Sequence, residues 1–217
     1  MTVTAMPPPA LILASGSPRR RELLAQIGVL HEVRAVDIDE TPHAGEAPAA
    51  MVERLARAKA AAGHAGTGQG GKSDARVSLG ADTTVVHAGR ALGKPADVAA
   101  ADAMLAELSA TTHEVLSAVA VAAATGIAST VVRTRVTFRE LTPAERAAYC
   151  ASGEPMGKAG GYAIQGLGAV FVRHIEGSYS NVVGLPLFET ARLLADAGID
   201  PLSARTEAGT QSGIRTP

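Results

Sequence analysis

Three consecutive arginines stand at the start of a segment that the sequence predicts to be helical. Residues 11–24 read LILASGSPRRRELL, in which an apolar run leads through small residues to a serine and a proline. Ser17 is expected as the N-cap and Pro18 as the first helical residue. The helix dipole disfavours cations at this end, by about 0.3–1 kcal/mol each at an exposed site.

This cost is offset if a polyanion binds at the turn. Guanidinium groups, serine hydroxyls and the free backbone N–H groups of a helix start are the donors that phosphate groups prefer. A solvated basic helix start is the alternative for an isolated run of arginines. The candidate anion-binding residues are Ser15, Ser17, Arg19 and Arg20.

A carboxylate interrupts two apolar runs in residues 79–86, which read LGADTTVV. The pattern predicts that a strand ends or kinks in the core at Asp82. A carboxylate there is costly unless it binds a cation, accepts hydrogen bonds or takes part in chemistry. An aspartate that caps a turn is the structural alternative.

Two lysines stand where they could meet the same anion. Lys94 lies in a Gly-Lys-Pro sequence, and Pro95 is expected to hold the chain extended and present the lysine from a rigid loop. Lys59 follows the apolar stripe of a helix predicted for residues 48–62. Its side chain therefore either extends into solvent or points into a cleft.

The glycine-rich segment of residues 153–166 combines a charge with an amide. Its glycines allow the backbone to approach a ligand closely, and Lys158 offers a cation. Gln165 carries an amide that is able to hydrogen bond to the edge of a base. The segment is not a Walker loop, because no serine or threonine follows its lysine.

A second carboxylate closes an acidic run, DIDE, that follows a predicted strand. Beside a phosphate site, Glu40 points to a hard divalent cation with oxygen ligands, although a solvated acidic loop has the same composition. The histidines lack the spacing of zinc ligands, so we do not expect zinc.

Composition limits the classes of partner. A formal net charge of −1 over 217 residues argues against bulk electrostatic capture of nucleic acid or of an anionic membrane. The single cysteine, Cys150, excludes an internal disulfide and is expected to pack inside a helix. We find neither a membrane-spanning run nor a signal peptide, so the cytoplasm is the expected location.

The chain between its two ends is expected to fold as one α/β domain, residues 10–203, with a mixed sheet. Residues 1–9 and 204–217 have the composition of disordered ends, and residues 63–74 that of a flexible loop. Helices are predicted at 18–28, 48–62, 96–108, 142–151 and 186–197, and strands at 11–15, 31–36, 77–81, 84–87, 91–92, 115–124, 128–138 and 169–175.

Five motifs, in this order along residues 11–197, resemble those of the Maf family of nucleoside triphosphate pyrophosphatases. They are SGSPRR (15–20), GADT (80–83), GKP (93–95), KAGGYAIQG (158–166) and GLP (184–186). The resemblance implies a mixed, twisted sheet with flanking helices and two lobes around a central cleft, as in inosine triphosphatase-like proteins, and a possible homodimer. It also implies a divalent metal, Mg²⁺ or Mn²⁺, and hydrolysis of a nucleoside triphosphate to the monophosphate and pyrophosphate.

Within the family, three positions resemble the branch that acts on dTTP and UTP: Arg19, Thr83 and Gln165. The branch that acts on 7-methyl-GTP carries Trp at the first of these positions and Glu at the last. The chain departs from the family at Gly157, where many members have an acidic residue, and in the length of the 63–74 loop.

The resemblance gives Asp82 the role of proton acceptor and makes Glu40 and Asp82 the expected metal ligands. A non-enzymatic nucleotide-binding regulator of cell division, or a pyrophosphatase for modified purine triphosphates, are the alternatives. The expected substrate-binding residues are Ser15, Ser17, Arg19, Arg20, Lys59, Thr83, Lys94, Lys158 and Gln165.

Overall fold

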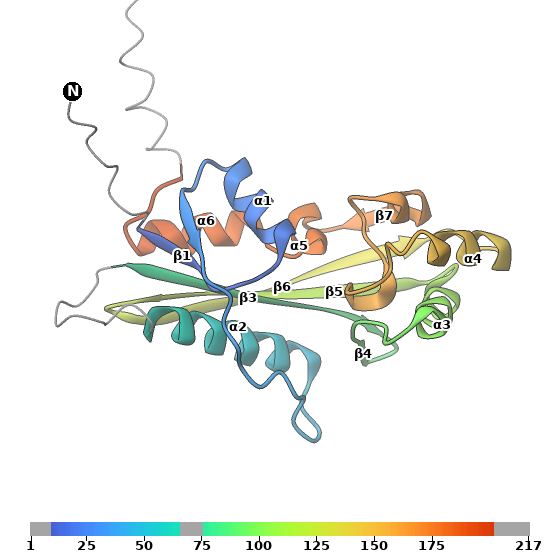
Figure 1. Cartoon of the computed structure of the whole chain (residues 1–217), viewed down its shortest axis with the longest axis horizontal. Helices are drawn as coiled ribbons and strands as arrows, with labels where there is room; N and C mark the ends of the chain where they lie inside the picture. Colours follow the sequence, from blue (N-terminus) through green and yellow to red (C-terminus); the bar gives the residue numbers. More distant parts are fainter. Residues whose placement is uncertain (1–9, 66–75, 202–217) are drawn as a thin grey trace, which may run out of the picture.

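Helices and strands alternate along the chain, and the described residues form one seven-stranded sheet with helices on both faces (Figure 1). The computed structural model describes residues 10–65 and 76–201. The two ends and most of the 63–74 loop, for which we expected disorder, therefore lie outside the described residues. The elements are β1 (Leu11–Leu13), α1 (Pro18–Gln26), β2 (His31–Val33), α2 (Pro48–Ala65), β3 (Val77–His87), β4 (Arg90–Leu92), α3 (Val98–Leu108), β5 (Thr112–Ala123), β6 (Gly126–Phe138), α4 (Pro143–Ala151), the 3-10 helices η1 (Ala159–Gly161) and η2 (Leu167–Phe171), β7 (Val172–Glu176), α5 (Tyr179–Val183) and α6 (Leu187–Asp196).

The sheet is mixed, as predicted. Its strand order is β2-β1-β3-β5-β6-β7, and β4 pairs with the end of β3. β1 runs parallel to β2 and to β3, and α1 and α2 supply the crossover connections that parallel neighbours need. The pairs from β3 through β5 and β6 to β7 are antiparallel.

One edge of β3 is covered in two pieces with a gap between them. β1 pairs with β3 as far as Leu79, opposite Leu13, and the chain then turns away. β4 begins to pair with β3 at Val85. Residues 80–84 of β3 therefore form strand ladders with β5 on one side, and their other edge stays open.

α2 covers one face of the sheet, while α1, α5 and α6 lie on the other (Figure 1). Small side chains let α2 approach closely, because alternate residues of β5, including Ala118 and Ala120, pack against it. The tightest approach is at Gly80, where an added Cβ would lie 2.3 Å from the backbone oxygen of Ala56 and 2.4 Å from the nitrogen of Ala60.

The predicted break at Asp82 is wrong, because β3 runs without interruption through this residue. An ion pair with a lysine satisfies the carboxylate inside the strand, so no turn is needed. α2 also continues past Gly63, to Ala65, instead of ending there. The helix predicted at 142–151 is present as α4 with Thr142 as its N-cap in a capping box, and the packed position expected for Cys150 is confirmed.

The C-terminal third differs most from the expectation. The predicted strand 169–175 is in part the helix η2, and β7 starts only at Val172. α5 was not predicted, since five residues are too few to show a helical period. Ser178 is its N-cap, and the Ser178 hydroxyl accepts a hydrogen bond from the backbone N–H of Asn181. None of the helices in residues 10–65 and 76–201 is long and apolar enough to span a membrane.

The substitution Gly80→Ala tests the packing of α2 on β3. The new methyl group would meet backbone atoms, which cannot rotate away, so we expect a loss of about 3 kcal/mol and a Tm lower by about 6–12 °C. Thermal unfolding followed by circular dichroism measures both. Gly93→Ala is the matched control, because nothing lies within 4 Å of its Cβ position. Equal melting temperatures for the two variants would contradict the close contact.

Candidate functional site

A cavity of about 560 Å³ lies at the open edge of β3, between the β1–α1 turn and α2 on one side and the loops next to η1 on the other. Elements from both ends of the sheet therefore contribute to its walls, as expected for a cleft between two lobes. All the residues singled out from the sequence line this cavity: Ser15, Ser17, Arg19, Arg20, Glu40, Lys59, Asp82, Thr83, Lys94, Lys158 and Gln165.

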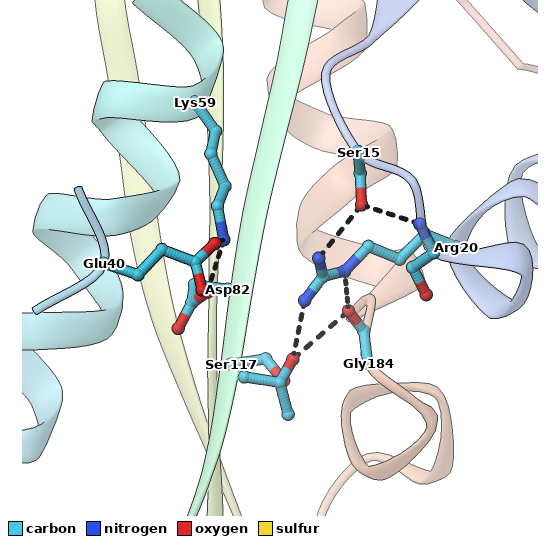
Figure 2. A network of polar contacts seen from close by, with 9 residues as sticks. Ser15, Arg20, Glu40, Lys59, Asp82, Ser117 and Gly184 are labelled. Atoms are coloured by element: carbon cyan, nitrogen blue, oxygen red, sulfur yellow. Dashed lines mark hydrogen bonds and ion pairs between the residues drawn. The ribbon is translucent and has the colours of Figure 1, made fainter. Parts of the chain in front are cut away.

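Two polar clusters border the cavity from opposite faces of β3 (Figure 2). Successive residues of a strand point to opposite faces, so Asp82 lies on the α2 side and Thr83 on the side of α1 and α5. Both reach the cavity because no neighbouring strand covers the β3 edge between them and the turn at Ser15. The sequence DT thus supplies a carboxylate to one cluster and a hydroxyl to the other.

The first cluster is an ion-pair triad. The Lys59 ammonium lies 2.8 Å from Oδ1 of Asp82 and 2.6 Å from Oε1 of Glu40, and the lysine is only 8% exposed. Lys59 therefore points into the cleft and not into solvent, which decides between the two alternatives that the sequence left open. The hydrogen bond from Lys59 holds the pKa of Glu40 below its usual value.

The second cluster holds the guanidinium of Arg20. Nε of Arg20 donates to the Gly184 carbonyl at 2.9 Å, and its two terminal nitrogens donate to the hydroxyls of Ser15 and Thr83 at 3.2 Å each. These three bonds come from three separate parts of the chain (Figure 2). A guanidinium has five N–H groups, so two remain for a ligand. Burial lowers the pKa of Arg20, while the Asp82 carboxylate opposes this shift.

Ser15 and not Ser17 supplies the hydroxyl at the start of α1. Ser17 occupies the N-cap position, but its hydroxyl makes no capping bond. Instead, the backbone N–H of Ser17 donates to the Ser15 hydroxyl oxygen at 3.2 Å. The N-cap residue was predicted correctly, whereas the capping bond that usually accompanies it is absent from this helix.

The glycine-rich segment is held in place by a carboxylate that the sequence did not point to. Glu154 accepts from the backbone N–H groups of Leu167 and Gly168 and from the Tyr149 hydroxyl. A Cβ at Gly166 would lie 2.1 Å from this carboxylate, so a larger residue there would displace it from these hydrogen bonds. Lys158 donates to the backbone oxygen of Glu154.

A backbone bond joins the two loops that carry the cavity's outer lysines. The N–H of Gly160 donates to the carbonyl of Gly93 at 3.1 Å, so the neighbours Lys94 and Lys158 belong to one wall. Gly160 has a φ of +68°, and a Cβ there would lie 2.7 Å from Val85. Burial and the nearby Arg19 lower the pKa of Lys158.

Charge in the cavity is unbalanced in favour of cations. Among the described residues, five basic side chains and two carboxylates line it. Arg19, Lys94 and Gln165 make no side-chain hydrogen bond or ion pair to another described residue. Their donors are therefore available to a ligand, and the excess of cations favours an anionic one.

Several site residues were missed from the sequence. Ser117 contacts Thr83 from the side away from the cavity, and Asn181 accepts from Ser117. No local sequence pattern predicts these contacts, because they depend on the pairing of β5 with β3 and on the position of α5. Gly184 was noted only as part of a motif, and its carbonyl is the strongest acceptor for Arg20. The register that places Ser117 opposite Thr83 is a long-range property.

Comparison with known families agrees with the motif order. Residues 10–197 match the family described as Maf-like protein, which spans almost all of the described chain. The chain belongs to the Maf family.

Curated relatives cover most of the chain at high identity. A protein of Myxococcus xanthus (strain DK1622) is 54% identical over 192 residues, which are 87% of this chain and 93% of the relative. One from Hahella chejuensis (strain KCTC 2396) is 53% identical over 189 residues, 87% of this chain and 92% of the relative. One from Anaeromyxobacter sp. (strain Fw109-5) is 50% identical over 212 residues, 95% and 98% of the two chains. Each of these relatives is named dTTP/UTP pyrophosphatase.

A buried histidine supports the cavity wall of this Maf-family protein from behind. Nε2 of His113 lies 2.8 Å from the hydroxyl of Tyr162, which lines the cavity. His113 is 1% exposed and packs edge-on against Phe138 and Tyr162. Burial, with a smaller effect from His87, lowers the pKa of His113 to about 4. The imidazole is therefore neutral at pH 7.

This burial predicts a pH-dependent stability. The unfolded histidine has a pKa of 6.5, so its contribution to stability is complete above that pH and is lost as the pH falls from 6.5 towards 4. Between pH 7.5 and pH 5 we expect a loss of about 2 kcal/mol from this group. Urea unfolding of the wild type and of His113→Gln at both pH values measures it. The wild type should lose about 2 kcal/mol more than the variant, and equal losses would show that His113 titrates normally.

Proposed function

We propose that this protein hydrolyses a nucleoside triphosphate, preferably dTTP or UTP, to the nucleoside monophosphate and pyrophosphate. The observation that carries the proposal is the pair of clusters in one cavity: anchored cations for a triphosphate, next to a carboxylate able to take a proton from water. The names of the curated relatives agree with this reaction and with this substrate class. The cavity volume of about 560 Å³ is also in the range of small-molecule sites.

The triphosphate is expected at the second cluster. The two free N–H groups of Arg20, the unpaired Arg19 and the backbone at the start of α1 all point to an anion there. Because Arg20 is already held by three hydrogen bonds, little side-chain entropy is lost when a phosphate binds it. Lys94 and Lys158 would neutralise charge from the opposite wall.

Asp82 is the proposed proton acceptor. Its Oδ1 is bound to Lys59, and its second oxygen has no hydrogen-bond partner among the described residues. That oxygen can accept a proton from a water molecule as the water attacks the α-phosphorus. The bond from the α-phosphorus to its bridging oxygen breaks, and pyrophosphate leaves with the electron pair. Lys59 holds the carboxylate in place.

The carboxylate pair fits a divalent cation of the Mg²⁺ or Mn²⁺ type. Glu40 and Asp82 each bind Lys59 through one oxygen, which leaves the second oxygen of each carboxylate for a metal next to the ammonium, and oxygen ligands suit these metals. In residues 10–65 and 76–201, no group of three or more acidic, histidine or cysteine side chains is arranged so that it could hold a metal ion without other ligands. Phosphate oxygens of the substrate and water would complete such a site, and a metal bound there would neutralise charge on the phosphates.

The base is expected at the Gln165 end. An amide can donate to a carbonyl and accept from the ring N–H of thymine or uracil, and Gln165 is exposed on the cavity wall without a protein partner. Hypoxanthine also presents a carbonyl next to a ring N–H, so the comparison of ITP with dTTP and UTP tests the modified-purine alternative. The regulator alternative leaves unexplained why a carboxylate is held in the middle of a strand beside the anion site.

We also propose a cytoplasmic location and a homodimer for this protein, and no nucleic-acid or membrane partner. The single cysteine and the near-neutral charge support the location and the absence of polyanionic partners. The homodimer rests on the resemblance to the family alone.

The substitution Asp82→Asn tests the mechanism. It keeps the shape and the hydrogen bonding to Lys59 but removes the basicity, so kcat should fall by about a hundredfold or more. Nucleotide binding should persist, because the second cluster is unchanged. Pyrophosphate release from dTTP and UTP gives kcat, and equilibrium titration gives the affinity.

Asp102→Asn is the matched control, since Asp102 pairs with Arg146 and neither residue lines the cavity. It should retain the wild-type rate. An Asp82→Asn enzyme with a near wild-type rate would assign Asp82 a structural role. A wild type that releases no pyrophosphate from dTTP, UTP, CTP, GTP, ITP or 7-methyl-GTP would remove the proposed function itself.

The substitution Gln165→Glu tests base recognition. A carboxylate cannot donate to the base carbonyl and repels it, so kcat/KM for dTTP and UTP should fall about tenfold or more relative to GTP and 7-methyl-GTP. The measurement is kcat/KM for the nucleotide panel with wild type and variant. Equal wild-type activity on all nucleotides, or an equal loss on all of them in the variant, would place base selection elsewhere.

A further inference from the structure

Two hydroxyls accept hydrogen bonds from the Arg20 guanidinium, and their own protons point to different places. Ser15 and Thr83 each lie 3.2 Å from a terminal nitrogen of Arg20. A guanidinium only donates, so each hydroxyl oxygen uses a lone pair here. Each hydroxyl still has one proton, and its direction follows from the neighbouring groups.

The proton of Thr83 is directed by two buried residues. The Ser117 hydroxyl lies 3.0 Å from the backbone carbonyl of Asn181. A carbonyl can only accept, so Ser117 donates its one hydroxyl proton to it. Ser117 also lies 2.8 Å from the Thr83 hydroxyl, and this contact then needs the proton of Thr83. The longer 3.4 Å contact from Thr83 to the Gly184 carbonyl is left without a proton, and that carbonyl serves Arg20.

Asn181 is fixed in this orientation by its own side chain. The residue is fully buried, and its amide nitrogen donates to the Val115 carbonyl and to the Thr134 hydroxyl. These bonds tie α5 to β5 and β6, and they hold the backbone carbonyl of Asn181 next to the Ser117 hydroxyl. Ser117 itself is also fully buried. The chain of bonds thus runs from the core to the cavity.

Ser15 is arranged in the opposite way. Its oxygen accepts from Arg20 and from the backbone N–H of Ser17, so both lone pairs are engaged. Its proton is free to be donated to an anion in the cavity. Of the two hydroxyls at Arg20, Ser15 is therefore a donor toward the ligand, whereas Thr83 has no proton left for one.

We propose that Ser117 and Asn181 are positioning residues for Arg20, acting through the Thr83 hydroxyl, and that Thr83 serves the triphosphate end of the site. This inference rests on the proposed function and refines it. Thr83 cannot donate to a carbonyl of the base, so the place that the resemblance gives it among the positions that distinguish substrates does not rest on such a bond. Its effect on catalysis passes through the orientation of the guanidinium.

A ligand without a base separates the two roles. We would measure the binding of inorganic tripolyphosphate and of dTTP by calorimetry, with EDTA present and with a phosphate assay to confirm that both ligands stay intact. Thr83→Val removes the acceptor for Arg20 and should weaken both ligands by the same factor, about five- to tenfold. Thr83→Ser keeps the hydroxyl and should restore the wild-type values.

Ser117→Ala tests the step behind Thr83. Without Ser117, the proton of Thr83 can turn to the Gly184 carbonyl and compete with Nε of Arg20. We expect about threefold weaker binding of both ligands, with rescue by Ser117→Thr and with an unchanged ratio of kcat/KM between dTTP and CTP. Thr112→Val is the control. Thr112 lies on β5, as Ser117 does, and the substitution removes its exposed hydrogen bond to the Thr137 hydroxyl on β6.

The outcomes are distinct. A Thr83→Val protein that binds dTTP more weakly but tripolyphosphate normally would make Thr83 a base-reading residue and overturn the inference. A Ser117→Ala protein with a lower Tm but wild-type affinities would make Ser117 merely structural and also overturn it. If the wild type releases no pyrophosphate from any nucleotide, the proposed function fails, while the tripolyphosphate affinities still decide the role of Thr83.

Discussion

The open stretch of the β3 edge is the constraint on which the rest of the site depends. A strand in the middle of a sheet would normally have both edges covered, and its two faces would be separated by its neighbours. Here β1 ends after Leu13 and β4 starts to pair only at Val85, so residues 80–84 face a cavity. Side chains from both faces of one strand can therefore act on one ligand.

The same geometry separates two clusters of different net charge. The Lys59 triad and the Arg20 cluster lie on opposite sides of the β3 backbone (Figure 2). The cation of the first is neutralised by two carboxylates, while that of the second is held only by neutral oxygens. An anion is thus favoured at the second cluster, where positive charge remains unpaired, and the proposed deprotonation of water belongs to the first. The strand sets the distance between the two events.

The sequence was sufficient to predict which residues share the cavity, but not the burial and the contacts of each side chain. Helix and strand alternation and the motif order were sufficient to predict the mixed α/β fold and a shared site. The depth of Lys59 was not predictable, because periodicity places it on a stripe, whereas its approach to Asp82 requires the close packing of α2 at Gly80. Ser117 and Asn181 could not be found, since strand register and a five-residue helix decide their contacts. A half-buried carboxylate inside a strand, that of Asp82, was mistaken for a strand end, because its ion-pair partner Lys59 is distant in sequence.

The contact between Arg20 and the Gly184 carbonyl joins residues 164 positions apart. Gly184 directly follows α5, so this anchor is in place only while α5 is packed against β5 and β6. Local opening of α5 would leave the Lys59 triad intact and the Arg20 guanidinium with two of its three anchors. The two polar clusters of the cavity therefore differ in what keeps them assembled: one depends on the packing of an 18-residue helix, the other on that of a five-residue helix.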